Sequence, residues 1–194
     1  FKPTQRKIIH ISNQTWKTGS EKTLKVFQLS GKVASDCYYH HGDASLSNAI
    51  ITMAQRFKNN APLLEEDGQF GSLRSPQAGA PRYIGTKLSE NFRLIYKDFE
   101  LLEYKEEEGE SIEPKFFLPI IPTVLINGSS GIAVGFASNI LNRDVKSIIE
   151  CCQKILTDKK ISEVNETKIV VSINNQDSFK AGDIAKFTGH FFTR

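Results

Sequence analysis

The residues of this chain best suited to chemistry are Arg82 and Tyr83, which stand together in the stretch 80–88 (Ala-Pro-Arg-Tyr-Ile-Gly-Thr-Lys-Leu). A tyrosine oxygen can attack a phosphate, but its unperturbed pKa of about 10 leaves it protonated at neutral pH. It therefore needs neighbouring cations that stabilise the phenolate and the charge developing on phosphorus. An arginine supplies a planar, always charged fork that fits phosphate oxygens. Most Arg-Tyr pairs are ordinary surface pairs without a chemical role. Further features of the chain are therefore needed to assign chemistry to Arg82 and Tyr83.

Charge is unevenly distributed along the 194 residues, although the net charge is only +3. Residues 1–32 hold seven Lys or Arg and one acid, whereas residues 98–113 hold eight acids and one Lys. The basic end can recruit a polyanion such as nucleic acid. The acidic stretch cannot lie against the same polyanion, so we expect it to form a solvated loop.

The three cysteines, Cys37, Cys151 and Cys152, form neither a disulfide framework nor a recurring metal-ligand spacing. Cys37 and His40 make at most one half of a metal site, and no second half is present. This cysteine usage indicates a reducing, intracellular compartment, and the sequence does not distinguish a nucleus from the host cytoplasm of a virus.

No targeting or membrane segment is visible in the sequence. The longest apolar run, residues 116–126, is too short to span a bilayer and contains two prolines. The chain starts in mid-pattern at Phe1 and stops abruptly at Arg194, so we expect a fragment of something longer.

The first half of the sequence predicts a helix-turn-helix unit preceded by a basic helix. Pro3 fits the first turn of that helix, and Lys2 and Arg6 are spaced to share one face, where they could contact successive phosphates. A short helix or extended piece follows over residues 25–34, and we expect it to end near Gly31. After a turn, apolar residues recur at helical spacing from 46 to 57, behind a cap at Asp43.

The second half predicts a wing and further short elements. Asp67-Gly68 is typical of a tight hairpin turn, and a helix should follow the Arg-Tyr turn through Leu88, Phe92 and Ile95. The remaining expectations, in chain order, are one or two buried strands in residues 116–126, a small-residue loop at 127–135 that exposes one branched apolar residue, a helix capped by Asn142, and strands from residue 168 onward.

Seven motifs in this order resemble the DNA breakage-and-rejoining region of type IIA DNA topoisomerases. They are Phe1-Lys2-Pro3-x-Gln5-Arg6-Lys7, Leu24-Lys25-Val26-x-Gln28-Leu29, Tyr39-His40-His41-Gly42-Asp43, Asp67-Gly68-Gln69-Phe70-Gly71, Pro81-Arg82-Tyr83-Ile84-x-Thr86-Lys87-Leu88, Pro119-x-x-Pro122-x-x-Leu125-x-Asn127-Gly128 and Gly131-Ile132-Ala133-Val134-Gly135. The His-His-Gly and Pro-Arg-Tyr-Ile forms are closer to eukaryotic and large-DNA-virus enzymes than to bacterial gyrases. The resemblance implies an α+β fold, with a winged-helix (CAP-like helix-turn-helix) domain at 1–120 and the truncated beginning of an α/β tower domain at 121–194.

The resemblance also implies roles for individual residues. Tyr83 would attack a DNA phosphodiester and become linked to its 5′ phosphate, while Arg82 and His41 would hold that phosphate and stabilise the transition state. Ile132 would enter between base pairs and kink the duplex; without the resemblance it would be read as a core residue. The other implied DNA contacts are Lys2, Gln5, Arg6, Lys7, Lys25 and His40.

Cofactors and partners follow from the same resemblance. Mg²⁺ and ATP would be bound by parts of the enzyme outside this fragment, namely a TOPRIM-type metal-binding domain and an ATPase domain. The implied partner is double-stranded DNA, with no membrane. Two tyrosines are needed for a double-strand break, so a twofold-symmetric dimer or heteromeric assembly is expected.

Two other interpretations share part of the same sequence features. A non-enzymatic winged-helix module would use the basic segment and the helix-turn-helix to bind DNA without chemistry. A plain interaction domain would use its basic and acidic ends to meet partners of opposite charge. None of these patterns encodes the source organism, the choice between relaxation and supercoiling, the cleavage-site preference or dimerisation of the fragment alone.

Overall fold

A computed structural model of the chain describes residues 1–17 and 22–157, and within it the chain divides into two compact units. The first unit comprises Phe1–Lys58 and Pro62–Ile120, and the second comprises Asn59–Ala61 and the chain from Ile121 onward. The strands expected from residue 168 onward lie outside the described residues.

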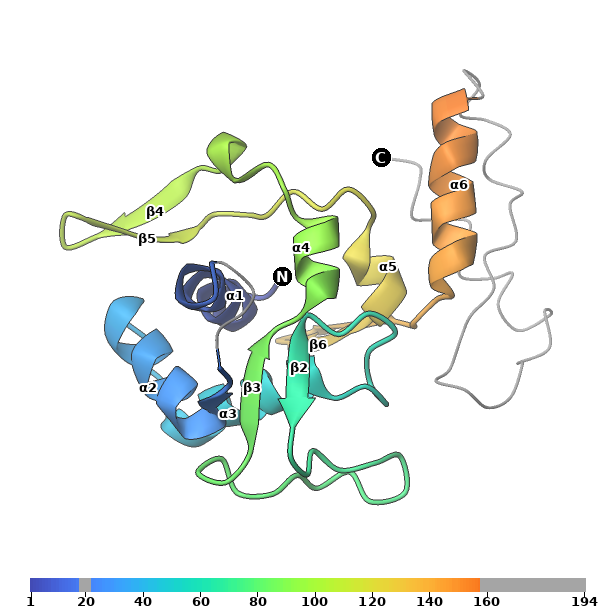
Figure 1. Cartoon of the computed structure of the whole chain (residues 1–194). Helices are drawn as coiled ribbons and strands as arrows, with labels where there is room; N and C mark the ends of the chain where they lie inside the picture. The colour runs from blue at the N-terminus through green and yellow to red at the C-terminus, as the bar shows by residue number, and fades with distance from the viewer. Residues whose placement is uncertain (18–21, 158–194) are drawn as a thin grey trace. The chain divides into compact units, whose positions relative to one another are not determined.

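Three helices and a small sheet build the first unit (Figure 1). The helices are α1 (Pro3–Thr15), α2 (Val26–Asp36) and α3 (Asp43–Ala54). The antiparallel sheet has the order β1-β3-β2, formed by β1 (Leu24–Lys25), β2 (Leu64–Asp67) and β3 (Gly85–Leu88). This is a mixed α+β arrangement in which a helix-turn-helix precedes a wing, as the sequence predicts.

The core of this unit lies among the three helices and the sheet. Its fully buried side chains include Ile8, Leu29, Leu46, Ile50, Leu64 and Phe92. Burial of each such side chain stabilises the fold by about 1.5–3 kcal/mol. The apolar stripe that the sequence shows in α3 is therefore core.

The bounds of α2 and α3 differ from the sequence prediction, and α3 ends at Ala54, before the last residue of the predicted apolar stripe at 57. α2 continues through Gly31 to Asp36, because Val33 is buried and supplies an apolar contact beyond the glycine. Gly42, rather than Asp43, is the N-cap of α3, and Asp43 lies in the first turn, where its charge favours the helix dipole.

The wing also differs from the prediction. Asp67-Gly68 does not make a tight hairpin, because β2 pairs with β3 across the long connection 68–84. The run after Tyr83 is the strand β3 and not a helix; its Thr86 is buried and donates a side-chain hydrogen bond to the carbonyl of Glu65 (2.7 Å). The helix α4 (Glu90–Ile95) begins only after Ser89, whose hydroxyl accepts the amide of Phe92.

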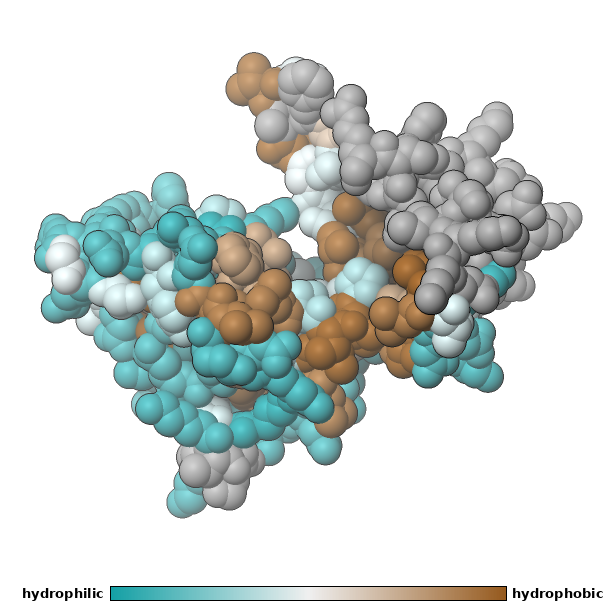
Figure 2. Space-filling model, turned by 90° about the horizontal axis from the view of Figure 1, so that it is seen from above, coloured by the Kyte–Doolittle hydropathy of each residue, from teal (hydrophilic) through white to brown (hydrophobic). Residues whose placement is uncertain are grey.

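The acidic stretch is a β-hairpin, and the expectation of a solvated loop is wrong. A 3₁₀ turn (Phe99–Leu101) leads into β4 (Tyr104–Glu107), which pairs antiparallel with β5 (Glu110–Pro114). The hairpin packs along α1 (Figure 1). Figure 2, which views the molecule from above, shows mostly hydrophilic residues on the left, where the hairpin lies. Pairing succeeds because Ile112 turns inward, while most of the acids remain at the surface.

Residues 115–120 close the first unit without forming the expected buried strand. Pro119 makes only one isolated bridge to Tyr96, and Phe116, Leu118 and Ile120 are exposed. The ring of Phe117 packs edge-on against Tyr96, with centroids 5.9 Å apart. A proline cannot donate a ladder hydrogen bond, which explains the missing strand.

The second unit contains α5 (Thr123–Asn127), the hairpin β6 (Ser129–Ala133) and β7 (Phe136–Ile140), and α6 (Val145–Thr157). The small-residue loop expected at 127–135 is thus mostly hairpin. Asp144, not Asn142, caps α6 by accepting the amide of Ser147 (2.8 Å). Asn127 exchanges two 2.8 Å hydrogen bonds with the backbone of Ala61, which ties residues 59–61 to this unit.

Candidate functional site

Tyr83 lies near the end of the connection between β2 and β3, with its ring open to solvent. The residue is 71% exposed, and the Cζ atom of Arg82 lies 5.7 Å from the centroid of the tyrosine ring. The phenol is therefore accessible to a large substrate, and a permanent cation lies beside it.

The backbone around Tyr83 is held although the side chain is exposed. The amide of Tyr83 donates to the carbonyl of Ala80 (2.9 Å). Two amides at the start of α2 donate outward, from Phe27 to Pro81 (3.1 Å) and from Val26 to Ile84 (3.0 Å). The turn is thus fastened on both sides of Arg82 and Tyr83 to the first residues of α2.

Lys25 adds a second cation to this turn. Its ammonium donates a 2.8 Å hydrogen bond to the main-chain carbonyl of Tyr83, while its own amide donates to the side chain of Gln28 (3.0 Å). The Leu-Lys-Val-x-Gln-Leu motif therefore caps α2 and contacts the turn that carries Tyr83 with the same residue.

Gln55, which was not predicted to have a role from the sequence, holds the segment 68–84 between β2 and β3 through hydrogen bonds to its backbone. It is only 1% exposed, and its amide donates to the carbonyls of Phe70 (2.7 Å) and Pro76 (3.2 Å). A glutamine directly after the apolar residues of α3 is the signal that could have identified it, because a buried amide must find hydrogen-bond partners.

The first turn of α1 presents basic groups to solvent. Lys2 is the N-cap residue and is exposed, and Arg6 is half-buried with its guanidinium 3.5 Å from the carbonyl of Phe1. A helix N-terminus favours anions, so an anion at this end of α1 would be stabilised. The side chain of Gln5 accepts the amide of Lys2 (2.9 Å), so its oxygen serves the cap.

Lys7 differs from its basic neighbours because its ammonium is used inside the fold. It pairs with Glu113 (2.8 Å) and donates to the carbonyl of Cys37, and only 13% of its side chain is exposed. The Lys7 ammonium is therefore occupied inside the fold. This geometry does not support the DNA contact expected for Lys7.

His40 and His41 are exposed on the turn between α2 and α3. The Nε2 atom of His40 lies 3.6 Å from a carboxylate oxygen of Glu107, and the ring of His41 packs on Tyr39 with centroids 5.3 Å apart. Tyr83 is fastened to the start of α2, whereas the histidines follow its end. The helix between these two points spans about 16 Å.

Ile132 lies in the second unit, on β6, and its side chain is 95% exposed. Val134 in the turn of the same hairpin is 99% exposed, so the hairpin presents two branched apolar residues and not the single one expected. A side chain so exposed is not part of a core, and that alternative for Ile132 is excluded.

Within residues 1–17 and 22–157, no three His, Cys, Asp or Glu side chains gather as a metal site. Cys37, the first half of the Cys-x-x-His pair, is fully buried, and burial raises the pKa of its thiol to about 12. None of the described helices is both long and apolar enough to cross a membrane.

The fold and the exposed Arg-Tyr turn define an α+β winged-helix protein. The family model of the DNA gyrase/topoisomerase IV A-subunit matches residues 1–184, and the chain belongs to this family. It is 42% identical over 163 residues to the DNA topoisomerase medium subunit of Enterobacteria phage T4, and 40% identical over 168 residues to DNA topoisomerase 2 of Plasmodium falciparum. The matching regions comprise 84% and 83% of this chain, respectively.

A crystal structure described as the DNA-binding, cleavage and re-ligation domain of Plasmodium falciparum topoisomerase II matches with a TM-score of 0.79 and 38% identity. The match covers 89% of this chain and 23% of that one. These relatives confirm the predicted resemblance to eukaryotic and viral topoisomerases. The chain spans 36% of the phage protein and 12% of the Plasmodium protein.

Proposed function

We propose that this chain is the DNA-cleavage and religation part of an ATP-dependent type II DNA topoisomerase. In this proposal a transient 5′-phosphotyrosyl link holds a double-strand break open while a second duplex passes through it. The observation that carries the proposal is the solvent-exposed Tyr83 ring, with Arg82 beside it, on a turn fastened to a helix-turn-helix.

The reaction we propose is a reversible transesterification. The phenol oxygen of Tyr83 attacks a DNA phosphorus, and the new oxygen–phosphorus bond forms as the bond to the 3′ oxygen breaks. The phenol loses its proton to a base, and the 3′ oxygen leaves as a hydroxyl after taking a proton. A phosphotyrosyl ester is close in energy to the bond it replaces, so the reverse attack reseals the strand without nucleotide hydrolysis.

Two cations assist this attack in the proposal. The guanidinium of Arg82 neutralises charge on the non-bridging phosphate oxygens as the transition state forms. Lys25 holds the backbone of Tyr83 and adds positive charge at the same turn. An arginine or a lysine at this place stabilises the phenolate as well as the phosphate.

The DNA contacts that we propose for the first unit are made by the N-terminal residues of α1, by Lys25 and by the turn after α2. Lys2 and Arg6 fix the register of the backbone, and His40 and His41 contact phosphate. We propose that His41 and Arg82 hold the phosphate that Tyr83 attacks, and that a twofold assembly supplies the second tyrosine needed for a double-strand break.

Ile132 is proposed to wedge between base pairs, at a cost of a few kcal/mol for unstacking that is offset by contacts to bent DNA. We assign residues 1–120 to the winged-helix domain. We assign the chain from residue 121 onward to a tower domain, of which it is the beginning. The free cysteines fit an intracellular, reducing compartment.

Mg²⁺ and ATP complete the proposed enzyme from other domains. The described residues offer no cluster of ligands that fits a metal ion, so we assign Mg²⁺ to a TOPRIM-type domain and ATP to an ATPase domain of the same enzyme. When bound there, Mg²⁺ supplies Lewis-acid stabilisation of the phosphate.

The test is covalent trapping of the full-length protein on DNA with Mg²⁺ present. Rapid denaturation of a cleavage reaction should yield protein–DNA adducts for the wild type and none for Tyr83→Phe, while both bind duplex DNA in a filter assay. Wild-type binding without any adduct would support the non-enzymatic winged-helix module instead. Adducts formed by Tyr83→Phe would remove the nucleophile assignment.

A further inference from the structure

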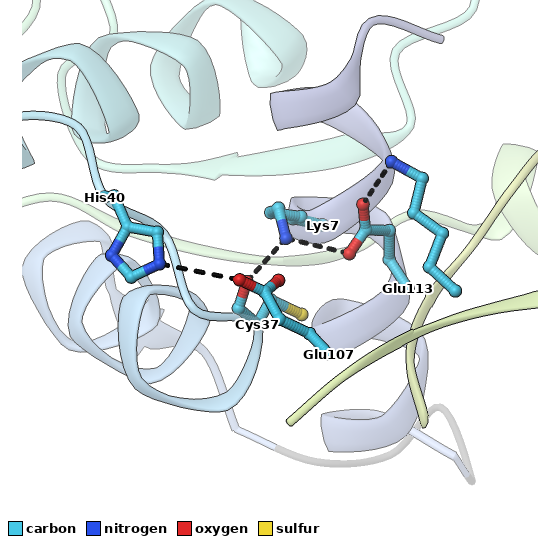
Figure 3. Close-up of polar contacts among 6 residues, drawn as sticks. Lys7, Cys37, His40, Glu107 and Glu113 are labelled. Carbon is cyan, nitrogen blue, oxygen red and sulfur yellow. Dashed lines mark hydrogen bonds and ion pairs between the residues drawn. The ribbon is translucent and has the colours of Figure 1, made fainter. Parts of the chain in front are cut away.

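The buried carboxylate of Glu113 joins three parts of the first unit (Figure 3). One carboxylate oxygen pairs with Lys7 of α1 at 2.8 Å, and the other lies 3.4 Å from Lys105 of β4. The same Lys7 ammonium donates to the carbonyl of Cys37, the C-cap residue of α2. A single ion pair thus links α1, the end of α2 and the β4–β5 hairpin.

The pair is strongly buried, with 13% of the Lys7 side chain and 1% of the Glu113 side chain exposed. Burial raises the pKa of the Glu113 carboxyl, but the hydrogen bond from Lys7 and the charges of Lys7 and Lys105 outweigh it. The net result is a pKa below the ordinary 4.5, so the carboxylate is ionised at neutral pH. Removing one partner of such a pair leaves an uncompensated buried charge.

The hairpin that carries Glu113 also contacts the turn after α2. Glu107 of β4 lies 3.6 Å from His40, and the hydroxyl of Tyr38 donates to Glu110 of β5 (3.4 Å). Tyr38 has a positive φ of 47°, an uncommon conformation for a residue with a side chain. The hairpin therefore contacts both elements that carry the proposed phosphate contacts, α1 and the histidine turn.

We propose that Glu113 is a positioning residue for DNA binding, because its pair with Lys7 sets the placement of α1 relative to the histidine turn. This inference rests on the proposed function, in which Lys2 and Arg6 of α1 and His40 and His41 of the turn contact one DNA backbone. A pair buried at the junction can fix that separation without touching DNA. The β4–β5 hairpin then holds α1 and the histidine turn in place without contacting DNA itself.

The inference makes a prediction whose sign is opposite to simple electrostatics. Loss of an acidic charge normally strengthens or preserves binding to a polyanion. Glu113→Gln should instead weaken binding of a short linear duplex by about tenfold, because misplaced contacts lose the geometry that makes them effective. The matched control is Glu106→Gln, the same charge change on the same hairpin at an exposed residue. It should leave the affinity unchanged or raise it.

A charge-neutral double variant separates positioning from stability. Lys7→Met with Glu113→Leu keeps the net charge and replaces the pair with apolar side chains, an exchange that often preserves folding. We expect thermal unfolding near that of the wild type and affinity still reduced by about tenfold, with a shallower slope of log affinity against log salt because fewer phosphates are contacted. An affinity within about twofold of the wild type would overturn the inference.

The experiments use the full-length protein, at temperatures where circular dichroism shows each variant to be folded. If Glu113→Gln alone does not fold, the affinity of the double variant tests the positioning role of Glu113. Wild-type protein that does not bind duplex DNA would contradict the proposed function itself. Wild-type binding that is matched by every folded variant would contradict only the positioning role of Glu113.

Discussion

The ammonium of Lys25 donates a 2.8 Å hydrogen bond to the main-chain carbonyl of Tyr83, which joins the start of α2 to the turn that carries the phenol. Lys25→Met should reduce the rate of adduct formation by about 10- to 100-fold, because both the clamp and a nearby charge are lost. Stability should change by less than about 0.5 kcal/mol, since Lys25 is exposed.

Quench-flow trapping on end-labelled duplex measures the effect of Lys25→Met. Lys22→Met is its matched control, because Lys22 is exposed in the same segment and its carbonyl, which the substitution keeps, accepts from the Trp16 indole. Equal rates for the two variants would show that only net charge matters at this turn.

Ile132 should affect DNA shape without affecting folding. Its side chain is 95% exposed, so Ile132→Ala should change unfolding free energy by less than about 0.5 kcal/mol. The same change should reduce DNA bending, measured by fluorescence transfer between the ends of a bound duplex, because the wedge is shortened. Val134→Ala tests the neighbouring exposed residue. A bend angle that survives Ile132→Ala but not Val134→Ala would reassign the wedge to Val134.

Two glycines should respond to alanine with opposite signs. Gly31 lies inside α2, where an added Cβ would meet nothing within 4 Å, so Gly31→Ala should stabilise the protein by about 0.5–1 kcal/mol. Gly71 has a φ of +86°, and an added Cβ would lie 2.8 Å from the backbone of Pro76. Gly71→Ala should destabilise by more than about 1 kcal/mol. Urea unfolding of both variants measures the difference, and equal shifts would contradict the backbone placed at Gly71.

Cys37 should be chemically silent in the folded protein. Burial raises the pKa of its thiol from 9.0 to about 12, and the thiolate is the reactive form. Because the folded pKa is raised, this group's contribution to stability is complete below pH 9 and is lost as the pH rises towards 12.

Iodoacetamide labelling followed by mass spectrometry measures the reactivity of Cys37. At pH 8 Cys37 should react only after unfolding, whereas the half-buried Cys152 should react first in the native protein. Native labelling of Cys37 at the rate seen in urea would show that the α2 C-cap is open.

Much of the helical framework was predictable from local signals. Pro3 at the first turn of α1 and the apolar stripe of α3 both act within one helix, and each prediction is confirmed. The strand β3 was not predictable in this way, because Gly85 and Thr86 form a strand only through pairing with β1 and β2. Long-range pairing leaves little trace in the local sequence.

The candidate site likewise contains residues that local sequence motifs reveal and residues whose role depends on a distant part of the chain. The Arg82-Tyr83 dipeptide is visible in the sequence because both residues belong to one motif. The internal role of Lys7 is not visible, because its partner Glu113 lies 106 residues further along the chain. Lysine in a basic segment looks like a DNA contact until the acidic hairpin is folded against α1.

The most direct test of the account is to identify the residue that carries the DNA. A trapped adduct is digested with nuclease and trypsin, and the nucleotide-bearing peptide is sequenced by mass spectrometry. Cleavage after Arg82 and Lys87 should release a peptide that starts at Tyr83, with a 5′-linked nucleotide on its phenol oxygen. A nucleotide found on any other residue, or a link to the 3′ phosphate, would contradict the assignment of Tyr83 as the nucleophile.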